Sequence, residues 1–359
     1  MILYGTVAAV AFLLIQRTER KRLDNRPSVS LIIPAKDEEE NLPGCLKSVE
    51  GLTYPHDKLE ILLVDDRSKD CTPEIMHSFA MGRKNVRVMR ITEPPALTGK
   101  CSALAAACRK ASGEWLFFTD ADCVLPPSWI ESMLESVDES TGMIGASVRI
   151  EEMKQPERTF TILQKLDWLF FCTMGSVCAR FGKPLSVFGN NMAIKKNVYD
   201  EAGGFEAAGK HVTEDFALMR LVREKTDAKI RFLLSPETTV LSRPCPNIGG
   251  FIRQRKRWAI GTRDRDAVSL TLLGTILFGH ALILISGVFK VYEVAAALFV
   301  WMTFWNGLLI FRGAPKAGTS VPFWWMIPYE LFLILYSLIL APFAFFGKTV
   351  TWKSDSVGR

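Results

Sequence analysis

The sequence predicts an α/β domain with a mainly parallel sheet, joined to helices that cross a membrane. Short apolar runs with strand composition alternate with helix-like stretches through residues 29–119, which is typical of a parallel sheet with crossover helices. Acidic residues stand where several of these runs end. After residue 266 the chain is largely uncharged, and a helix needs about 20 apolar residues to cross a bilayer.

Four apolar runs are expected to form the first strands, at residues 29–33, 60–64, 86–91 and 114–119. Three helix-like stretches separate them, at residues 41–52, 72–81 and 99–112. In sheets of this kind, ligands bind beyond the carboxyl ends of the strands. The residues that follow each run are therefore the first candidates for a binding site.

The second half of the domain has a less regular pattern. Residues 143–150 are expected to form one more strand. Residues 160–181 carry many aromatic and aliphatic side chains and few charges. This composition fits two structures equally well, a helix in the protein core or an interfacial helix that lies on the bilayer.

Three uncharged stretches predict membrane spans, at residues 267–289, 294–311 and 323–346. Glu330 interrupts the last one, and a position near a helix end is expected for it because a charge inside a span is costly. Residues 1–15 are also uncharged and predict an anchoring fourth span rather than a cleaved signal peptide. The expected division is an anchor at 1–16, a polar domain at 17–266, a membrane domain at 267–347 and a tail at 348–359.

Basic residues flank the polar domain on both sides and set its expected orientation. They are Arg17, Arg20, Lys21, Arg22 and Arg26 before it, and Arg253, Arg255, Lys256, Arg257, Arg263 and Arg265 after it. Basic flanks stay on the inner side, so we expect an integral protein of the cell (inner) membrane with its domain in the cytosol. The net charge of +6 is expected to attract the protein to anionic lipid headgroups. No nucleic-acid partner is expected.

Two acidic pairs follow the predicted strands. Asp120 and Asp122 form an Asp-x-Asp pair, and Mg²⁺ or Mn²⁺ is the expected cofactor because these ions take oxygen ligands and bridge phosphates. Such an ion neutralises the charge of a diphosphate leaving group. Asp65 and Asp66 end the second run, where a carboxylate can accept from a base N–H or a ribose hydroxyl. Each pair alone also fits an ordinary turn.

Glu214 and Asp215 follow Thr213 at the start of a predicted helix. One explanation is helix capping, with acids in the first turn. The other is a general base that takes the proton of an attacking hydroxyl. The two roles are compatible, because a helix start can hold a carboxylate at a cleft.

Gln254, Arg257 and Trp258 belong to a basic segment before the first C-terminal span. The segment is either a membrane flank or a clamp, in which Arg257 binds a diphosphate and Trp258 offers its face to a ring. Lys100 follows Gly99 at a predicted helix start and is either a surface lysine or a phosphate ligand. The full phosphate-loop motif is absent there.

In this order and spacing the motifs resemble glycosyltransferase family 2, inverting enzymes with a single nucleotide-sugar-binding α/β domain. The resemblance covers about residues 28–260 and implies a glycosyltransferase A-type fold. It depends on the segments 33–39, 64–68, 119–122, 203–205, 213–215 and 254–258.

The resemblance implies a role for each matched residue. Donor binding is implied for Pro34, Glu38, Asp66, Lys100, Asp120 and Gln254, and metal binding for Asp122. Catalysis is implied for Asp215 as the base, together with Glu214, Arg257 and Trp258. Lys36 and Asp37 stand where the family often has an aromatic residue and Asn, so stacking on the base is not implied. Uridine is the family's usual base.

The same motifs occur in polysaccharide synthases and in enzymes that glycosylate membrane lipids, such as ceramide and carotenoid glucosyltransferases. About four spans can hardly line a channel for a polar chain, so transfer of one hexose to a hydroxyl of a lipid acceptor is the favoured function. A processive polysaccharide synthase is one alternative. A non-catalytic membrane protein that binds a nucleotide sugar is the other, although such a protein would need no base at Asp215.

Overall fold

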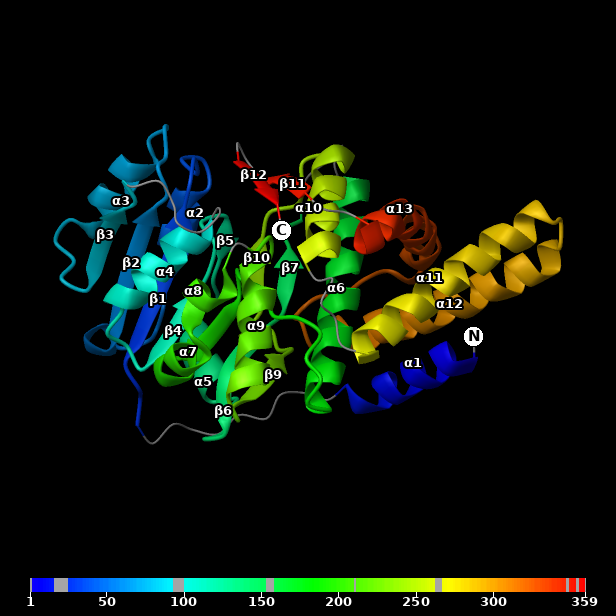
Figure 1. Ribbon diagram of the computed structural model, residues 1–359, viewed down its shortest axis with the longest axis horizontal. Helices are drawn as coiled ribbons and strands as arrows, with labels where there is room; N and C mark the ends of the chain where they lie inside the picture. The colour runs from blue at the N-terminus through cyan, green and yellow to red at the C-terminus, as the bar shows by residue number, and fades with distance from the viewer. Residues whose placement is uncertain are drawn as a thin grey trace.

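The computed structural model describes residues 2–15, 25–92, 100–152, 158–209, 211–261, 267–346, 349–352 and 355–358. An α/β domain occupies one end of the molecule, and long apolar helices occupy the other end (Figure 1). The fold class predicted from the sequence is confirmed.

Within the described residues, the domain is built on a seven-stranded sheet in the order β3-β2-β1-β4-β8-β6-β9. Its strands are β1 (Val29–Ala35), β2 (Leu59–Asp65), β3 (Val86–Arg90), β4 (Trp115–Phe118), β6 (Thr141–Ala146), β8 (Met192–Lys195) and β9 (Lys229–Leu233). The four strands predicted first are all parallel, whereas β8 runs antiparallel to both of its neighbours. The carboxyl ends of β1, β2 and β4 therefore share one edge of the sheet.

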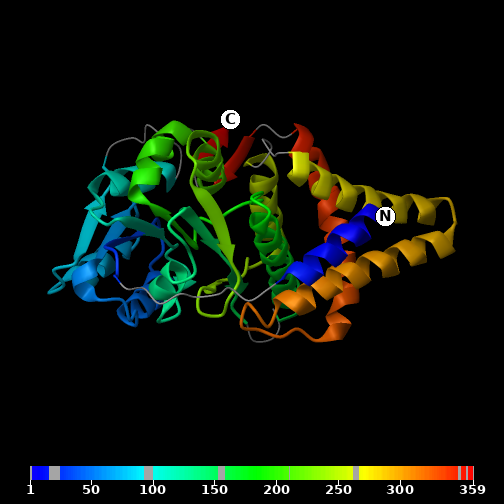
Figure 2. The same ribbon diagram turned by 90° about the horizontal axis from the view of Figure 1, so that it is seen from below.

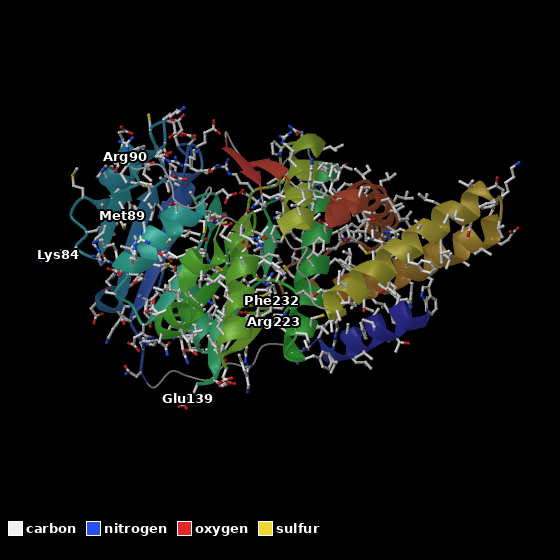
Figure 3. All side chains as sticks on the ribbon, viewed as in Figure 1. Lys84, Met89, Arg90, Glu139, Arg223 and Phe232 are labelled. Atoms are coloured by element: carbon white, nitrogen blue, oxygen red, sulfur yellow. The ribbon has the colours of Figure 1, made fainter. Side chains whose placement is uncertain are left out.

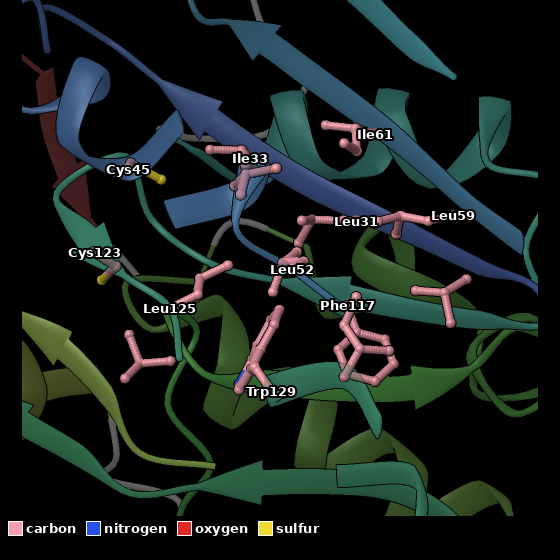
Figure 4. Packing of buried hydrophobic residues seen from close by; sticks show 14 of the residues in the cluster. Leu31, Ile33, Cys45, Leu52, Leu59, Ile61, Phe117, Cys123, Leu125 and Trp129 are labelled. Carbon is pink, nitrogen blue, oxygen red and sulfur yellow. The ribbon is translucent and has the colours of Figure 1, made fainter. Parts of the chain in front are cut away.

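Helices cover both faces of the sheet, because alternate residues of each strand point to opposite sides. Leu31 and Ile33 of β1 pack with Trp129 on one face (Figure 4), whereas Ile32 enters the core of the other face. The first face is covered by α2 (Leu42–Glu50), α3 (Thr72–Ala80) and α5 (Trp129–Leu134). The second is covered by α4 (Lys100–Lys110), α7 (Lys196–Ala202), α8 (Gly204–Ala208) and α9 (Glu214–Lys225).

Pro34 lies inside β1, which continues beyond the predicted end of this strand. The backbone N–H of Asp66 donates to Ala35 O at 2.8 Å, so Ala35 faces β2 and Pro34 faces the side of β4. However, β4 pairs with β1 only as far as Ile32. Pro34 has no N–H to donate to β4, so it stands where the pairing of these two strands ends, a position at which a strand accepts a proline.

Residues 143–150 form two strands, so the prediction of a single strand was wrong. β6 ends at Ala146, and β7 (Val148–Ile150) joins β10 (Val240–Ser242) and β5 (Cys123–Val124) in a second sheet of the described chain. Ser147 lies between the two strands. Its N–H donates to Leu233 O at 3.0 Å and its carbonyl accepts from Val240 N at 3.2 Å, so its backbone bonds pass from one sheet to the other.

α6 (Arg158–Arg180) is a core helix, which decides between the two structures that its composition allowed. Most of its side chains are buried, and Leu166, Asp167 and Cys172 are fully enclosed. The helix packs against β7 and β9 on one side and against the apolar helices α12 and α13 on the other. It therefore joins the α/β domain to the apolar helices through one continuous core.

The described residues contain three helices long and apolar enough to cross a membrane, at the predicted places. They are α11 (Ala267–Val288), α12 (Tyr292–Gly313) and α13 (Met326–Phe346), the last preceded by a 3₁₀ turn (Phe323–Trp325). α11 and α12 form an antiparallel hairpin that extends away from the domain, whereas α13 crosses them (Figure 2). α10 (Ile248–Gly261) precedes this group and packs on α13.

α1 (Ile2–Leu14) packs beside α12 (Figure 2). At the rise of an α-helix its 13 residues extend about 20 Å, less than the roughly 30 Å of a bilayer core, so the fourth span stays a prediction. The predicted domain division also stays a prediction, and part of the flanking positive charge lies outside the described residues, at Arg17, Arg20, Lys21, Arg22, Arg263 and Arg265. In the predicted tail, β11 (Thr349–Trp352) and β12 (Asp355–Gly358) pair as a hairpin.

Glu330 lies near the start of α13, as predicted, and its buried carboxylate is also paired. Asn306 Nδ2 of α12 donates to Glu330 Oε2 at 2.6 Å, and His280 Nε2 of α11 lies 3.3 Å from Glu330 Oε1. Tyr4 of α1 donates to Asn306 Oδ1, so a polar cluster connects four apolar helices. This pairing offsets the cost of an acid among apolar helices.

Asn191→Ala is expected to destabilise the domain strongly. The buried Asn191 side chain accepts from Trp129 Nε1 at 3.0 Å and donates to Ser147 O at 2.7 Å and Thr238 O at 2.8 Å. Its removal leaves Trp129 Nε1 and Thr238 O unpaired, at about 1–3 kcal/mol for each, and takes one of the two hydrogen bonds from Ser147 O. Chemical denaturation should show a loss of about 3 kcal/mol or more, whereas Asn197→Ala, at an exposed position on α7, should change stability little. Equal effects of the two changes would contradict the role of Asn191.

Candidate active site

The predicted donor-side residues lie at the shared edge of β1, β2 and β4. Asp65 ends β2, and its Oδ1 accepts the N–H of Ser68 at 2.9 Å. Arg90, at the end of the outermost strand β3 (Figure 3), places its Nε 3.2 Å from Asp65 Oδ2. Asp65 therefore fixes the turn after β2. Asp66 is also buried, at 2% exposure. Its N–H donates to Ala35 O, so its backbone faces β1.

Asp66 keeps an acceptor that no group of the described chain uses. Its Oδ1 accepts from Arg67 Nε at 3.0 Å, whereas its buried Oδ2 has no hydrogen-bond partner. Arg67 Nη2 is also buried without a partner, and the backbone of Arg67 is left-handed, with φ 61°. A buried unpaired acceptor is costly unless a ligand satisfies it, so this position suits the N–H of a bound molecule.

The loop after β1 holds Glu38 and Asp37. Glu38 N donates to Thr72 Oγ1 at 2.8 Å, and Asn41 Nδ2 donates to Glu38 Oε2 at 2.6 Å. Asp37 accepts the N–H of Lys69 at 2.8 Å, which ties this loop to the turn after β2. Asp37, which departs from the family pattern, therefore stabilises the loop. Its own backbone is left-handed, with φ 54°.

Lys100 connects the donor-side carboxylates to the start of α9. Its Nζ forms an ion pair with Asp120 Oδ1 and lies 3.6 Å from Glu214 Oε1. Burial lowers the pKa of Lys100, but the attraction of Asp120 and Glu214 outweighs it and the pKa is raised overall. Lys100 is therefore a charged group inside the site and not a surface lysine.

Asp122 is the residue predicted to bind a metal, and its surroundings fit that prediction. Burial and the neighbouring Asp120 carboxylate raise its pKa to about 6, with a smaller contribution from Glu38. Excess negative charge of this kind favours a cation. Within the described residues no three His, Cys, Asp or Glu side chains form a complete metal site. A divalent ion held by one or two carboxylates together with substrate phosphates fits this arrangement, because Mg²⁺ commonly binds in that way.

Asp215 is held at the start of α9 by two backbone donors. Gly189 N donates to its Oδ2 at 2.8 Å and Phe216 N donates to its Oδ1 at 2.8 Å. Burial and Glu214 raise its pKa to about 6, while these hydrogen bonds and Arg257 lower it. Thr213 is the N-cap residue of α9 but makes no side-chain capping bond. A fixed carboxylate with a pKa near neutrality can act as a general base.

α10 carries the other side of the site. Arg257 Nη1 donates to Val212 O at 3.3 Å, just before the start of α9. The Trp258 ring lies 5.2 Å from that of Trp168 and stacks on that of Phe188 at 6.5 Å. Phe188 precedes Gly189, so this aromatic group adjoins the residue that holds Asp215. One face of the site is therefore apolar, on the side of the apolar helices.

Two features escaped the sequence analysis. Gly189 is not among the predicted site residues, yet its N–H donates to Asp215 Oδ2, and a Cβ there would lie 3.4 Å from that oxygen. Arg255 was counted as flanking charge, but it is 3% exposed and paired with Asp167 of α6. Asp167 is the single acid within the apolar stretch 160–181 and was the signal for this pair.

Comparison with known proteins finds a family match over part of the chain. Residues 30–203 match the sequence profile of glycosyl transferase family 2. The chain contains a glycosyltransferase family 2 domain. The resemblance found in the sequence is confirmed, and the matched region includes β2, β3, β4 and all of β1 except Val29.

Curated relatives of this chain differ in what their names describe. A probable glycosyltransferase of Bacillus subtilis is 28% identical over 248 residues, 68% of this chain and 57% of the relative. A β-monoglucosyldiacylglycerol synthase of Nostoc sp. is 25% identical over 246 residues, 67% and 50% of the two chains. A poly-β-1,6-N-acetyl-D-glucosamine synthase of Staphylococcus epidermidis is 26% identical over 265 residues, 70% and 58%. The chain spans a little more than half the length of these relatives.

One solved structure resembles this chain over almost its whole length. It is a mannosyltransferase of Pyrobaculum calidifontis in complex with GDP-mannose and Mn²⁺, with a TM-score of 0.60 and 18% identity over 97% of this chain and 95% of that one. At this identity the likeness shows the fold, which confirms the glycosyltransferase A-type fold implied by the sequence.

Asp122→Asn is expected to weaken metal-dependent binding of a nucleoside diphosphate. The amide keeps the size of the side chain but removes the charge that the neighbouring carboxylates and burial make costly without a cation. Calorimetric titration of UDP and GDP, with and without Mn²⁺, should show the loss of a metal effect on the order of 10-fold to 100-fold. An unchanged dependence on Mn²⁺ would remove the metal assignment.

Proposed function

We propose that this chain is a membrane-bound inverting hexosyltransferase. It moves a hexose from a nucleoside-diphosphate sugar to a hydroxyl of a lipid acceptor. The observation that carries the proposal is the position of Asp215. This fixed carboxylate belongs to the same site as the Lys100–Asp120 ion pair. It lies between the shared edge of β1, β2 and β4, where the donor is proposed to bind, and the helices that pack on α13.

The donor side follows from the chemistry of the sheet edge. Asp66 offers an unused acceptor to the base or ribose, and Glu38 and Pro34 lie in the adjoining part of β1 and its loop. Lys100, Asp120 and Gln254 are proposed to face the nucleotide, with Arg257 beside the diphosphate. Bound Mg²⁺ or Mn²⁺, held by Asp122, would neutralise the charge of the departing diphosphate. A UDP-sugar is the first donor to test.

The chemical step needs a base that is free of its proton at neutral pH. The acceptor hydroxyl forms a bond to the anomeric carbon as the bond from that carbon to the diphosphate oxygen breaks. The hydroxyl proton passes to Asp215, and the nucleoside diphosphate leaves. Attack opposite to the leaving group inverts the configuration at the anomeric carbon. Glu214 keeps Lys100 charged beside this centre.

The acceptor side is proposed to face the bilayer. Trp258, Phe188, Trp168 and Phe171 present an apolar surface next to Asp215, and this group shares one core with α12 and α13. A lipid hydroxyl can reach the base along this surface without crossing the polar donor side. A relative named for the synthesis of a glucosylated diacylglycerol supports a lipid acceptor. We propose the inner membrane, with the domain in the cytosol.

Two other functions remain as outcomes of the test. A processive polysaccharide synthase is favoured by the relative named for the synthesis of a polymer of N-acetylglucosamine. A protein that binds nucleotide sugars without turnover would have the donor side alone. The raised pKa of Asp215 argues against the second function, because binding of a donor needs no base.

The decisive experiment supplies purified protein with membrane lipids of its host, Mn²⁺ or Mg²⁺, and radiolabelled nucleotide sugars that include UDP-glucose and GDP-mannose. Labelled products are separated by solvent partition and by size. Label in a discrete species of the organic phase supports lipid glycosylation. Label in a large insoluble product identifies a polysaccharide synthase, and donor binding without any labelled product identifies a binding protein.

Asp215→Asn should abolish transfer while it preserves donor binding. Loss of a general base lowers the rate by roughly 10²–10⁴-fold, and Asn still accepts a backbone hydrogen bond. Turnover and UDP affinity are measured for this variant and for Asp200→Asn, which removes an exposed acid on α7. Normal turnover of Asp215→Asn would leave this residue as a component of the helix start only.

The rate of transfer should fall in acid. Burial and Glu214 raise the pKa of Asp215 to about 6, so the base is deprotonated above this pH and protonated below it. At saturating metal, kcat should decrease by about tenfold for each pH unit below 6. A rate that stays constant from pH 7 to pH 4.5 would contradict the assignment.

A further inference from the structure

Arg255 is a buried charge within the helix that carries Gln254 and Trp258. Its side chain is 3% exposed, and that of its partner Asp167 of α6 is fully enclosed. Arg255 Nε donates to Asp167 Oδ2 at 2.9 Å, and Arg255 Nη2 donates to the same oxygen. A guanidinium does not lose its proton in proteins, so this charge needs its partner.

The same guanidinium holds two residues of the site. Its Nη1 donates to Gln254 Oε1 at 2.7 Å. Its central carbon lies 4.1 Å from the centre of the Trp258 ring, within the range of a cation–π interaction. The orientation of both Gln254 and Trp258 is therefore tied to the position of one buried group.

Asp167 connects this group to a helix of the apolar bundle. Tyr336 of α13 donates its hydroxyl to Asp167 Oδ1, the oxygen that Arg255 does not use. Tyr336 is 6% exposed and its ring also packs on Phe251 of α10 at 5.3 Å. A continuous chain of polar contacts thus runs from α13 through α6 to the residues of α10 that border the site.

We propose that Arg255 is a positioning residue and that Asp167 and Tyr336 couple α13 to the acceptor side of the site. This inference rests on the proposed transfer reaction. A displacement of α13 moves the Tyr336 hydroxyl, and Asp167 and Arg255 follow because neither buried charge can be left unpaired. Gln254 and Trp258 then shift relative to Asp215. The site is fully formed only when α13 is packed in its membrane position.

The coupling makes a specific demand on the kinetics. Most residues proposed to bind the donor, such as Asp66, Asp120 and Lys100, lie outside α6, α10 and α13. Gln254 and Arg257, on α10, are the exceptions. Loss of the coupling should therefore lower kcat far more than it changes the KM for the donor, because most of the proposed donor contacts are not displaced. A general loss of folded protein would instead scale the apparent rate with the amount of active enzyme.

The experiment compares Tyr336→Phe with Tyr329→Phe in the full chain reconstituted in lipid nanodiscs. Both tyrosines are buried on α13, but the Tyr329 hydroxyl has no hydrogen-bond partner among the described residues, so its removal breaks no bond. Tyr336→Phe should lower kcat by about 10-fold to 100-fold, with a donor KM within about twofold of the original. Tyr329→Phe should behave as the unchanged protein.

A second measurement does not depend on activity. Hydrogen exchange is followed in peptides of α10 and, as an internal control, of α4. Tyr336→Phe should accelerate exchange in α10 and leave α4 unchanged, whereas Tyr329→Phe should change neither.

Arg255→Lys should impair kcat less than Arg255→Gln, because Lys keeps the charge beside Asp167 but lacks the planar fork.

The outcomes separate the two claims. If the unchanged protein transfers no sugar, the proposed function fails, and hydrogen exchange in α10 still decides the coupling. If Tyr336→Phe matches Tyr329→Phe in both exchange and kcat, the coupling is wrong. If Tyr336→Phe lowers only the melting temperature and the fraction of active enzyme, the contact is structural and the positioning role is overturned.

Discussion

The parallel arrangement of β1, β2 and β4 is the constraint on which the site depends. Parallel strands end at the same edge, so residues that follow three separate segments of the chain meet there. Asp66 and Asp122 are brought to one side of the domain by this pairing alone. The antiparallel strand β8 then returns the chain from the turn that includes Gly189, whose backbone holds Asp215. The residues proposed to bind the donor and the proposed base are thus positioned by the geometry of a single sheet.

Charge is the second organising feature of the site. Asp120, Asp122, Glu214 and Asp215 are gathered with Lys100 as the internal cation and Arg257 nearby. Burial raises the pKa values of Asp122 and Asp215, and the excess of negative charge left by one lysine between two carboxylates raises them further. The excess suits a divalent ion at Asp122 and a proton acceptor at Asp215. The same physical cause thus supports two different roles at two positions.

Much of this arrangement could be predicted from the sequence, because it depends on local patterns. The apolar runs before Asp66 and Asp120 gave the strands, and their order gave the parallel sheet. The two strands within residues 143–150 could not be separated, because the switch at Ser147 depends on backbone partners at Leu233 and Val240 that are distant in sequence. The core position of α6 was undecided for a similar reason. Its apolar surface is compatible with lipid or with protein, and only the packing against α12 and α13 decides.

The basic segment before α11 shows where a compositional explanation fails. Positive charge next to a membrane span is usual, and Arg255 fits that explanation as well as Arg253 does. In the fold, α10 places Arg255 in the interior, beside Asp167. Arg253, two residues earlier, lies on the opposite side of the helix and stays exposed. Neighbouring arginines therefore differ in function through the periodicity of the helix. The contact partner is 88 residues away, so the sequence pattern alone cannot assign the pair.

The most direct test of the account is the position of Mn²⁺ and a nucleoside diphosphate bound to the protein, located by anomalous X-ray scattering from the metal. A metal peak is expected beside the Asp122 carboxylate. The nucleotide base is expected against Asp66, and the diphosphate between the end of β4 and α10. A metal peak away from Asp122, or a nucleotide bound elsewhere than at the edge formed by β1, β2 and β4, would contradict the account.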